Sequence, residues 1–565
     1  MKRYALIFVS LLAIMMQAQG NDTLQREVTI LRNFTPVVRE VNKINTMPPI
    51  TTPTFDREAV SYATDAFAAD VTTTPSKVDI SYAASQQETL SRYKGYANFD
   101  MGMYMAMVAN AGYRILDTKN DHLGVAAQFT SIDGAMPINS SFLPMDDEAK
   151  TRQTFYDVRA GLNYAHVFNN NLTVALNASY RYAYFNYYGV MGEGEHSVQQ
   201  ANNCNIELRV DNREAQQYDY EKWHAIAGYQ LYDNASGLYV PNATREHYAY
   251  VDLLYQHMLN DYWSAGADID GEYLQYNGLL GSPFTEEGSI VLPHATLTKH
   301  IFMMRLLPYA AWSKGPASFR AGVKMDISAG DGNVFCVAPD VRFNWEFIKN
   351  YFLFVNIGGG KQLNRWGDVS QYCLYFDPAE SIPSSYSPLD AELGFRMRFI
   401  PELYVTLFGG YEIADKALFQ RVDGFSQTVA WDAIDAQCIK AGLAVNAEIT
   451  EYVTLSADAA YRHWSRNGEA ITYNRPRWEA NVSVAVHPFE QLDVKLDYNM
   501  QLERDFGAYG KLADVHNLQL YATYRVFDWL SVSLHGNNLL NRCHDYYFGL
   551  PAPGIQVMGG VAVKF

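Results

Sequence analysis

The chain has 565 residues, a formal net charge of −17 and a mean hydropathy of −0.20, with 61 acidic against 44 basic side chains. This acidic balance excludes the broad positive surface that nucleic-acid binding requires, so nucleic acid is not an expected partner. The five cysteines are odd in number and widely spaced, which predicts neither a disulfide framework nor a zinc site.

The first 20 residues have the pattern of a signal peptide. Lys2 and Arg3 precede an apolar run over residues 5–16, and small residues follow at positions 18–20. The run is shorter than the roughly 20 residues that a membrane-spanning helix needs. We expect residues 1–20 to be removed on export, and no later run is long and apolar enough for a helix to span a membrane.

Residues 21–92 are rich in Thr and Pro and mixed in charge, which predicts an extended periplasmic arm. Residues 93–565 predict a barrel on the pattern given below, and the arm is too short for the globular plug that fills the barrels of large active transporters. Any occlusion of the barrel lumen is therefore expected from loops or inward side chains. Within the arm, residues 32–45 alternate charged with apolar residues, a pattern that suits docking by strand addition or simple packing under the barrel mouth. The candidate docking residues are Phe34, Pro36, Val37, Val38, Arg39 and Ile44.

Residues 93–565 alternate with a period of two in one segment after another. Over residues 478–487 every second position is apolar, beginning at Trp478, and most positions between are polar, beginning at Glu479. Successive side chains of a strand point to opposite faces, so this pattern is typical of strands that separate lipid from a polar lumen. The sequence predicts an all-β fold, a transmembrane antiparallel β-barrel that lacks a globular plug domain.

Nine very short turns join these segments in pairs and predict about 20 strands, with a range of about 18 to 22. The turns lie near residues 117–121, 169–171, 259–261, 313–316, 348–351, 400–402, 449–451, 487–490 and 527–529. The connection over residues 188–243 is long enough to hold a further hairpin around Trp223 to Tyr232. The count is least secure in that connection.

Short turns are typical of the periplasmic side of such barrels, so both termini are expected in the periplasm. The longest connections, over residues 133–151, 188–243 and 364–388, are then expected to face the outside. The last strand ends at Phe565, a terminal aromatic typical of recognition by the barrel-assembly machinery. The expected surroundings are the lipid and lipopolysaccharide of a Gram-negative outer membrane, with a further periplasmic or outer-membrane protein as a candidate partner.

Three segments carry a resemblance to a known family. They are residues 32–45 of the arm, the barrel opening Tyr93-Lys94-Gly95-Tyr96-Ala97-Asn98, and the closing hairpin from Asn537 to the ending Gly559-Gly560-Val561-Ala562-Val563-Lys564-Phe565. The first two together resemble a family of plugless, TonB-dependent-receptor-like outer-membrane β-barrels of Bacteroidetes, and the closing hairpin resembles the closing strands of TonB-dependent receptors. The resemblance implies an outer-membrane address and a barrel of similar size, but no substrate. Residues 27–30 superficially resemble a TonB-contacting segment.

The sequence contains no constellation that predicts an enzyme, a cofactor or a metal. Ser533 and His535 share a predicted lumen face, but a wet lumen contains such residues without catalysis. Cys543-His544-Asp545 is compact but lacks a second pair of ligands. Five charged residues are predicted to line the lumen, either along a conduction path or in a salt-bridged network: Arg396, Arg398, Asp493, Lys495 and Asp497.

Two functions follow as hypotheses. The first is a channel or transporter for small solutes, gated by the outer loops. The second is a non-enzymatic subunit or scaffold of an envelope complex, which docks partners through the arm and the outer loops.

Overall fold

The computed structural model describes residues 93–137, 150–168, 172–189, 198–212, 221–234, 244–279, 284–286, 289–291, 297–376, 381–422, 429–471, 475–504, 510–547 and 549–565. The predicted signal peptide and the whole arm, with its docking residues 34–44, lie outside the described residues. Among the described residues, no helix is long and apolar enough to cross a membrane.

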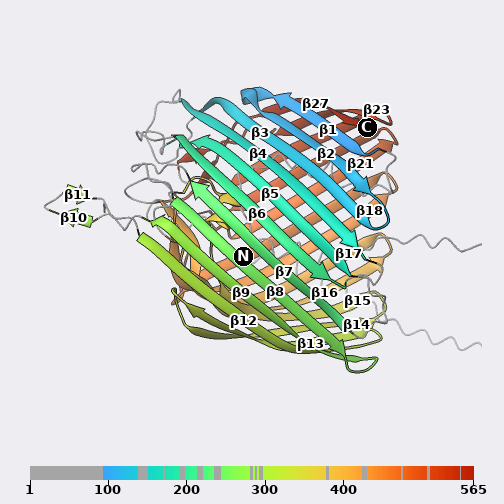
Figure 1. Cartoon of the computed structure of the whole chain (residues 1–565). Coiled ribbons are helices and arrows are strands. Elements are labelled where there is room, and N and C mark those ends of the chain that lie inside the picture. Colours follow the sequence, from blue (N-terminus) through green and yellow to red (C-terminus); the bar gives the residue numbers. More distant parts are fainter. Residues whose placement is uncertain are drawn as a thin grey trace, which may run out of the picture. The chain divides into compact units, whose positions relative to one another are not determined.

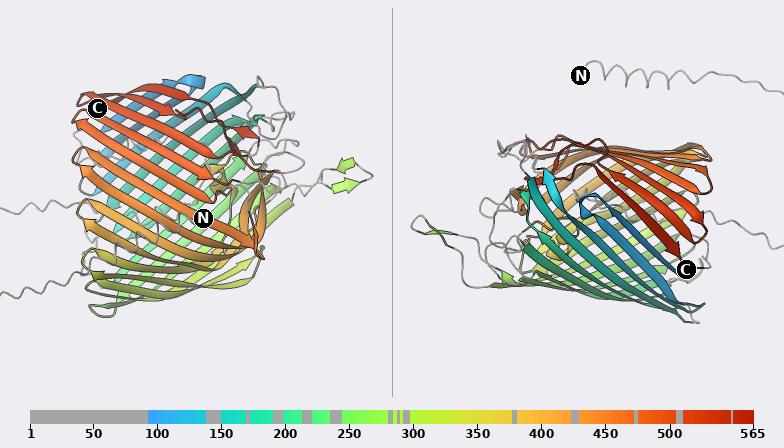
Figure 2. Two further views of the ribbon diagram at one scale, coloured as in Figure 1. Left: turned by 180° about the vertical axis from the view of Figure 1, so that it is seen from behind. Right: turned by 90° about the horizontal axis from the view of Figure 1, so that it is seen from above.

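Twenty-two antiparallel strands pair in chain order and close into a barrel, because β1 pairs with β27 (Figures 1 and 2). The first half contains β1 (Gly95–Gly102), β2 (Met107–Asp117), β3 (Asp121–Pro137), β4 (Lys150–Val167), β5 (Thr173–Asn186), β6 (Val198–Asp211), β7 (Glu221–Asn234), β8 (Thr244–Met258), β9 (Trp263–Leu279), β12 (Leu297–Lys314) and β13 (Ala317–Ala329). The second half contains β14 (Phe335–Ile348), β15 (Tyr351–Gln362), β16 (Ser385–Ile400), β17 (Leu403–Val422), β18 (Val429–Thr450), β19 (Val453–Arg466), β21 (Trp478–Phe489), β22 (Leu492–Leu502), β23 (Val515–Phe527), β24 (Leu530–Asn537) and β27 (Gln556–Lys564).

Short elements lie between these strands. They are the 3-10 turn η1 (Met103–Met105), the hairpin of β10 (Phe284–Glu286) and β11 (Ser289–Val291), the helix α3 (Trp366–Tyr372), the strand β20 (Glu469–Ala470), and the hairpin of β25 (Asp545–Tyr547) and β26 (Leu550–Pro551).

The structure confirms the all-β antiparallel barrel, and its strand number falls at the upper end of the predicted range. Eight of the nine predicted turns lie at the junctions of consecutive strands, and the ninth, at residues 169–171, lies outside the described residues. The hairpin that the sequence placed less securely around Trp223 to Tyr232 is present as β6 and β7. It accounts for the two strands beyond twenty.

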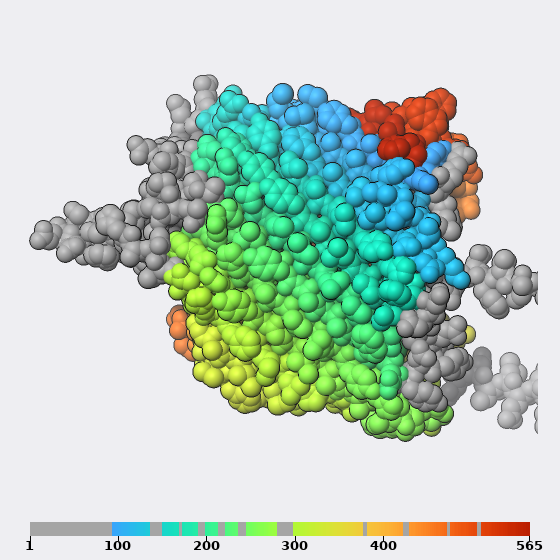
Figure 3. Space-filling model, viewed as in Figure 1, coloured from blue at the N-terminus to red at the C-terminus, as the bar shows by residue number. Residues whose placement is uncertain are grey.

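The outer face of the barrel is apolar, as the alternation predicts. On β21, Trp478 is 46% exposed, whereas the next residue, Glu479, is buried on the inner side. Exposed Leu, Val, Ile, Phe and Tyr side chains recur on every second residue around the wall, one face of which is seen in Figure 3. An apolar surface of this extent is unfavourable in water and suits a lipid environment.

The two ends of the barrel differ. The short turns and the first residue of β1 lie at one end, here called the turn end, where the backbone N–H of Gly95 donates to the carbonyl of Phe565 at 2.7 Å. The opposite end, on the left in Figure 1, is the loop end. The largest buried cluster lies inside the barrel toward the loop end and combines wall tyrosines with residues of the connection between β15 and β16.

Candidate functional site

The connection between β15 and β16 folds into the barrel. We call residues 363–384 the inner segment, of which the structure describes 363–376 and 381–384. It contains α3, and Trp366, Val369 and Cys373 are almost completely buried. The sequence predicted residues 364–388 to be an outward-facing loop, which is wrong in direction, and β16 already begins at Ser385. The physical reason is that Trp366, Val369 and the C-cap residue Cys373 form one apolar face of α3. Exposing this face to water would be unfavourable, so it packs inside the barrel. The expectation that any occlusion of the lumen comes from loops or inward side chains stays a prediction.

Two glycines at the end of β15 allow the chain to turn inward. Gly359 and Gly360 have φ values of +150° and +121°, and the register shifts beside them. The chain is held immediately afterwards, because the backbone N–H of Lys361 donates to Asp326 at 2.7 Å and its carbonyl accepts a hydrogen bond from Arg305. Arg305 and Asp326 form an ion pair at 2.7 Å, so two wall strands fix the entry of the inner segment.

The two ends of the inner segment are tied together at a neck. The side-chain amide of Asn364 donates to the carbonyl of Pro383 at 2.7 Å and to the hydroxyl of Ser385 at 2.8 Å. Asp331 accepts the backbone N–H of Ser384 at 2.7 Å. The two ends of the inner segment therefore lie side by side at the start of β16.

Glu246 on β8 holds the start of α3. Its carboxylate accepts the backbone N–H of Trp366 at 2.6 Å and of Gly367 at 2.9 Å. The first N–H groups of a helix have no partner within the helix, and a carboxylate is a strong acceptor for them. Glu246 is itself 1% exposed, so the wall supplies a buried charge for this purpose.

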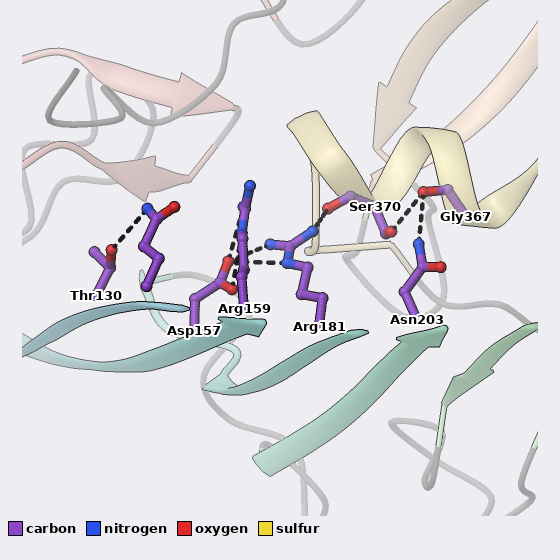
Figure 4. Close-up of polar contacts among 8 residues, drawn as sticks. Thr130, Asp157, Arg159, Arg181, Asn203, Gly367 and Ser370 are labelled. Carbon is purple, nitrogen blue, oxygen red and sulfur yellow. Dashed lines mark hydrogen bonds and ion pairs between the residues drawn. The ribbon is translucent and has the colours of Figure 1, made fainter. Parts of the chain in front are cut away.

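Two further wall residues bind carbonyls of α3 (Figure 4). Arg181 on β5 donates to the carbonyl of Ser370 at 2.9 Å, and Asn203 on β6 donates to the carbonyl of Gly367 at 3.4 Å. Asp157 on β4 holds Arg181 through hydrogen bonds of 2.9 and 2.6 Å. Asp157 therefore orients the guanidinium of Arg181 toward α3.

Tyrosine hydroxyls bind three more carbonyls of the inner segment. Tyr276 donates to Asn364 at 3.1 Å, Tyr187 to Phe376 at 2.9 Å, and Tyr547 to Tyr372 at 3.0 Å. We call the six side chains that bind the main chain of Asn364–Phe376 the cradle: Arg181, Tyr187, Asn203, Glu246, Tyr276 and Tyr547.

Side chains of the segment add anchors. Trp366 is 0% exposed, and its ring centroid lies 4.6 Å from that of Tyr276 and 6.5 Å from that of Tyr232. The guanidinium of Arg365 lies 3.6 Å from the ring centroid of Tyr248 and donates to Gln230 at 3.0 Å. Tilted and edge-to-face aromatic contacts are favourable geometries, and a cation–π contact strengthens when it is shielded from water.

The last loop adds residues to the buried cluster toward the loop end. Tyr547 and Leu550 of the β25–β26 hairpin are 0% exposed. Burial raises the pKa of Asp545 to about 7, and the positive charge of Arg504 partly opposes this rise. Burial lowers the pKa of His544 to about 4, and the charge of Arg504 lowers it further. Arg504 donates to the carbonyl of Tyr546 at 2.8 Å, which links this hairpin to the end of β22.

The five charged residues predicted to line the lumen occur in two separate groups. Arg398 donates to the carbonyl of Pro401 at 3.0 Å, and Arg396 lies over the ring of Phe354 at 5.4 Å from its centroid. On β22, Lys495 pairs with Asp497 at 2.8 Å, and Asp493 pairs with His487 at 2.5 Å. The structure does not bring the two groups together, and a role in conduction stays a prediction.

The other residues considered from the sequence do not converge on a site. Ser533 donates to Asp100 at 2.6 Å. Cys543 is exposed, whereas His544 and Asp545 are buried. One carboxylate group within the described residues, Asp252, Asp268 and Asp270, has oxygens within 4.8 Å of one another on β8 and β9. Asp252 is bonded there to His224 at 3.1 Å, and the group by itself assigns no metal.

Sequence reasoning missed the cradle and the inward position of the inner segment. Glu246 and Arg181 lie on polar strand faces, where charged residues are common, so nothing in the sequence distinguished them. The spacing of Trp366, Val369 and Cys373 was a usable signal, because apolar residues three and four apart form one face of a helix.

Comparisons with known proteins bear on the fold alone. No protein-family model and no curated protein matches the chain. Among solved structures, the chain is similar to the copper transporter OprC (TM-score 0.61, 11% identity, covering 85% of this chain and 82% of that chain). It is also similar to the FrpB iron transporter from Neisseria meningitidis (TM-score 0.63, 11% identity, covering 84% of this chain and 82% of that chain). A third similar structure is the siderophore receptor PirA from Acinetobacter baumannii (TM-score 0.62, 10% identity, covering 85% of this chain and 81% of that chain). The barrel thus has the fold of transporters and receptors for metals and siderophores.

Proposed function

We propose that the chain is an outer-membrane transporter or channel for small solutes, and that the inner segment is its gate. The observation that carries this proposal is the seating of the inner segment inside the barrel at the loop end. The fold similarity to metal and siderophore transporters supports transport as the class of activity, and the substrate is left open.

The apolar outer wall supports the outer membrane as the location, with the turn end in the periplasm and the loop end outside. Phe565 is 58% exposed at the turn end and stacks with Tyr113. This position suits recognition by the barrel-assembly machinery, and lipid and lipopolysaccharide would surround the wall. The length of residues 21–92 supports the further proposal that no globular plug fills the lumen.

Water is expected in the lumen toward the turn end. On the inner face there, the side chain of Arg342 is 61% exposed and that of His487 is 44% exposed. Wide barrels of this strand number enclose a lumen that needs a separate element to close it. The inner segment supplies such an element at the loop end.

The cradle suits a closure that can be released. Most of its contacts are hydrogen bonds to polar side chains, and each typically contributes about 0.5–1.5 kcal/mol net. Water can replace such bonds when the segment leaves, and the neck keeps the segment attached to β15 and β16.

Single-channel recording in a planar bilayer tests the proposal. Three proteins are compared: the mature chain, a variant with residues 364–383 replaced by a short Gly-Ser linker, and a variant without residues 21–92. We expect the mature chain to be mostly closed and the linker variant to conduct steadily. A linker variant that stays closed would contradict the gate.

A second candidate is a scaffold subunit of an envelope complex, favoured by the charged and apolar alternation of residues 32–45. The docking residues Phe34 to Ile44 would then bind a periplasmic or outer-membrane partner. This candidate predicts that all three proteins stay closed in the bilayer.

A further inference from the structure

We propose that the cradle is a binding site for a polypeptide, and that the inner segment occupies it in place of a peptide supplied from outside. The ligand would be a peptide about as long as Asn364–Phe376, with an aromatic anchor preceded by a basic residue. This inference rests on the proposed function, because the segment must leave before another peptide can enter.

The cradle recognises main-chain atoms. Five of its side chains donate to carbonyls of the segment, and Glu246 accepts two of its N–H groups. The wall backbone adds a further contact, because the N–H of Val429 donates to the carbonyl of Tyr375 at 3.0 Å. Carbonyl and N–H groups recur in every peptide, so this pattern fits peptides of different sequence.

The donors and acceptors are spread along the length of Asn364–Phe376. Carbonyls are bound at Asn364, Gly367, Ser370, Tyr372 and Phe376. A ligand without regularly placed carbonyl and N–H groups, such as a simple sugar or a metal complex, would leave buried polar groups of the cradle unpaired. Leaving such groups unpaired is costly, so the cradle discriminates in favour of peptides.

The anchors give the site a preference. The position of Trp366 lies between Tyr232 and Tyr276, and the position of Arg365 lies against Tyr248 and Gln230. A large aromatic residue in a desolvated pocket is the usual centre of a peptide-binding site. We expect an Arg-Trp or Lys-Trp pair to bind best.

The test uses a fluorescent synthetic peptide with the sequence of residues 363–376, carrying Cys373→Ser. Fluorescence anisotropy is measured with detergent-solubilised protein. The linker variant, whose cradle is free of residues 364–383, should bind the peptide saturably and at least tenfold more tightly than the unmodified chain. Adding Glu246→Gln to the linker variant should weaken binding about tenfold, and a peptide with Trp366→Ala should bind weakly.

A full-length variant guards against misfolding of the linker variant. Trp366→Ala in the intact chain loosens the segment without deleting it, and this variant should bind the wild-type peptide more tightly than the unmodified chain does. A linker variant that conducts in the bilayer but binds no peptide would overturn the inference and leave the gate standing. Equal, unsaturable binding to every variant would also overturn it.

Discussion

The carboxylate of Glu246 accepts the backbone N–H of Trp366 at 2.6 Å across 120 residues of sequence. This bond joins the barrel wall to the first turn of α3 and is completely shielded from water. The inner segment is therefore held by a buried carboxyl group of the wall that accepts two of its backbone N–H groups.

Glu246→Gln should favour the open state. The substitution removes the charge and leaves one acceptor for two N–H groups, and a hydrogen bond to a charged group contributes about 1.5–3 kcal/mol. We expect the open probability in single-channel recordings to rise about tenfold or more. Glu221→Gln is the matched control, because Glu221 is exposed at the turn end of the barrel and its carboxylate bonds Tyr255 and His257. An equal rise in both variants would contradict the assigned role of Glu246.

Trp366→Ala should expose Cys373. Replacing a buried Trp by Ala costs about 3–5 kcal/mol, which should unseat the segment. Burial raises the pKa of the Cys373 thiol to about 12 and keeps it unreactive in the closed chain, whereas Cys543 is exposed. Maleimide labelling followed by peptide mass spectrometry should find Cys543 modified in both proteins and Cys373 modified only in the variant. Trp345→Ala, on the exposed outer face, should leave Cys373 protected.

Gly359→Ala should strain the entry of the inner segment. A Cβ at Gly359 would lie 2.3 Å from the carbonyl oxygen of Ser387, and φ there is +150°. A strained backbone of this kind costs about 1–3 kcal/mol, so the thermal unfolding midpoint should fall. Gly358→Ala is the control, because a Cβ there meets nothing within 4 Å. Similar midpoints for the two variants would show that the inward turn does not depend on glycine.

The last loop should show opposing pH dependences. The pKa of Asp545 is raised from 3.8 to about 7, so its contribution to stability is lost as pH rises through that range. The pKa of His544 is lowered from 6.5 to about 4, so its contribution is lost as pH falls through that range. Between pH 4.5 and 6.5 the two effects should nearly cancel in the unmodified chain. Over that interval, the unfolding midpoint should rise with pH in Asp545→Asn and fall in His544→Gln, and parallel profiles would contradict this account.

The strand pattern could be predicted because it depends on local chemistry. Alternation at Trp478 and Glu479 reflects the two faces of a strand between lipid and lumen, and each short turn carries its own signal. The hairpin of β6 and β7 was less certain, because no clear short turn marks the connection after Asp211.

The inner segment could not be placed from the sequence, because its position depends on partners far along the chain. Glu246, Arg181 and Tyr547 come from three distant strands or loops, and each alone is an ordinary residue of a polar face or a loop. Only the closure of the barrel brings them around α3. The glycines at 359 and 360 showed that the backbone could turn, but not in which direction.

The most direct test of the gate is a recording made while a membrane-impermeant maleimide is added on the loop side of a bilayer containing the Glu246→Gln variant. Each opening should expose Cys373, and its modification should prevent the segment from reseating, so the current should rise stepwise and persist. The same variant with Cys373→Ser should be unaffected. Persistent opening of both proteins after maleimide would contradict the claim that the inner segment closes the lumen. So would channels that open in both proteins but never stay open after maleimide is added.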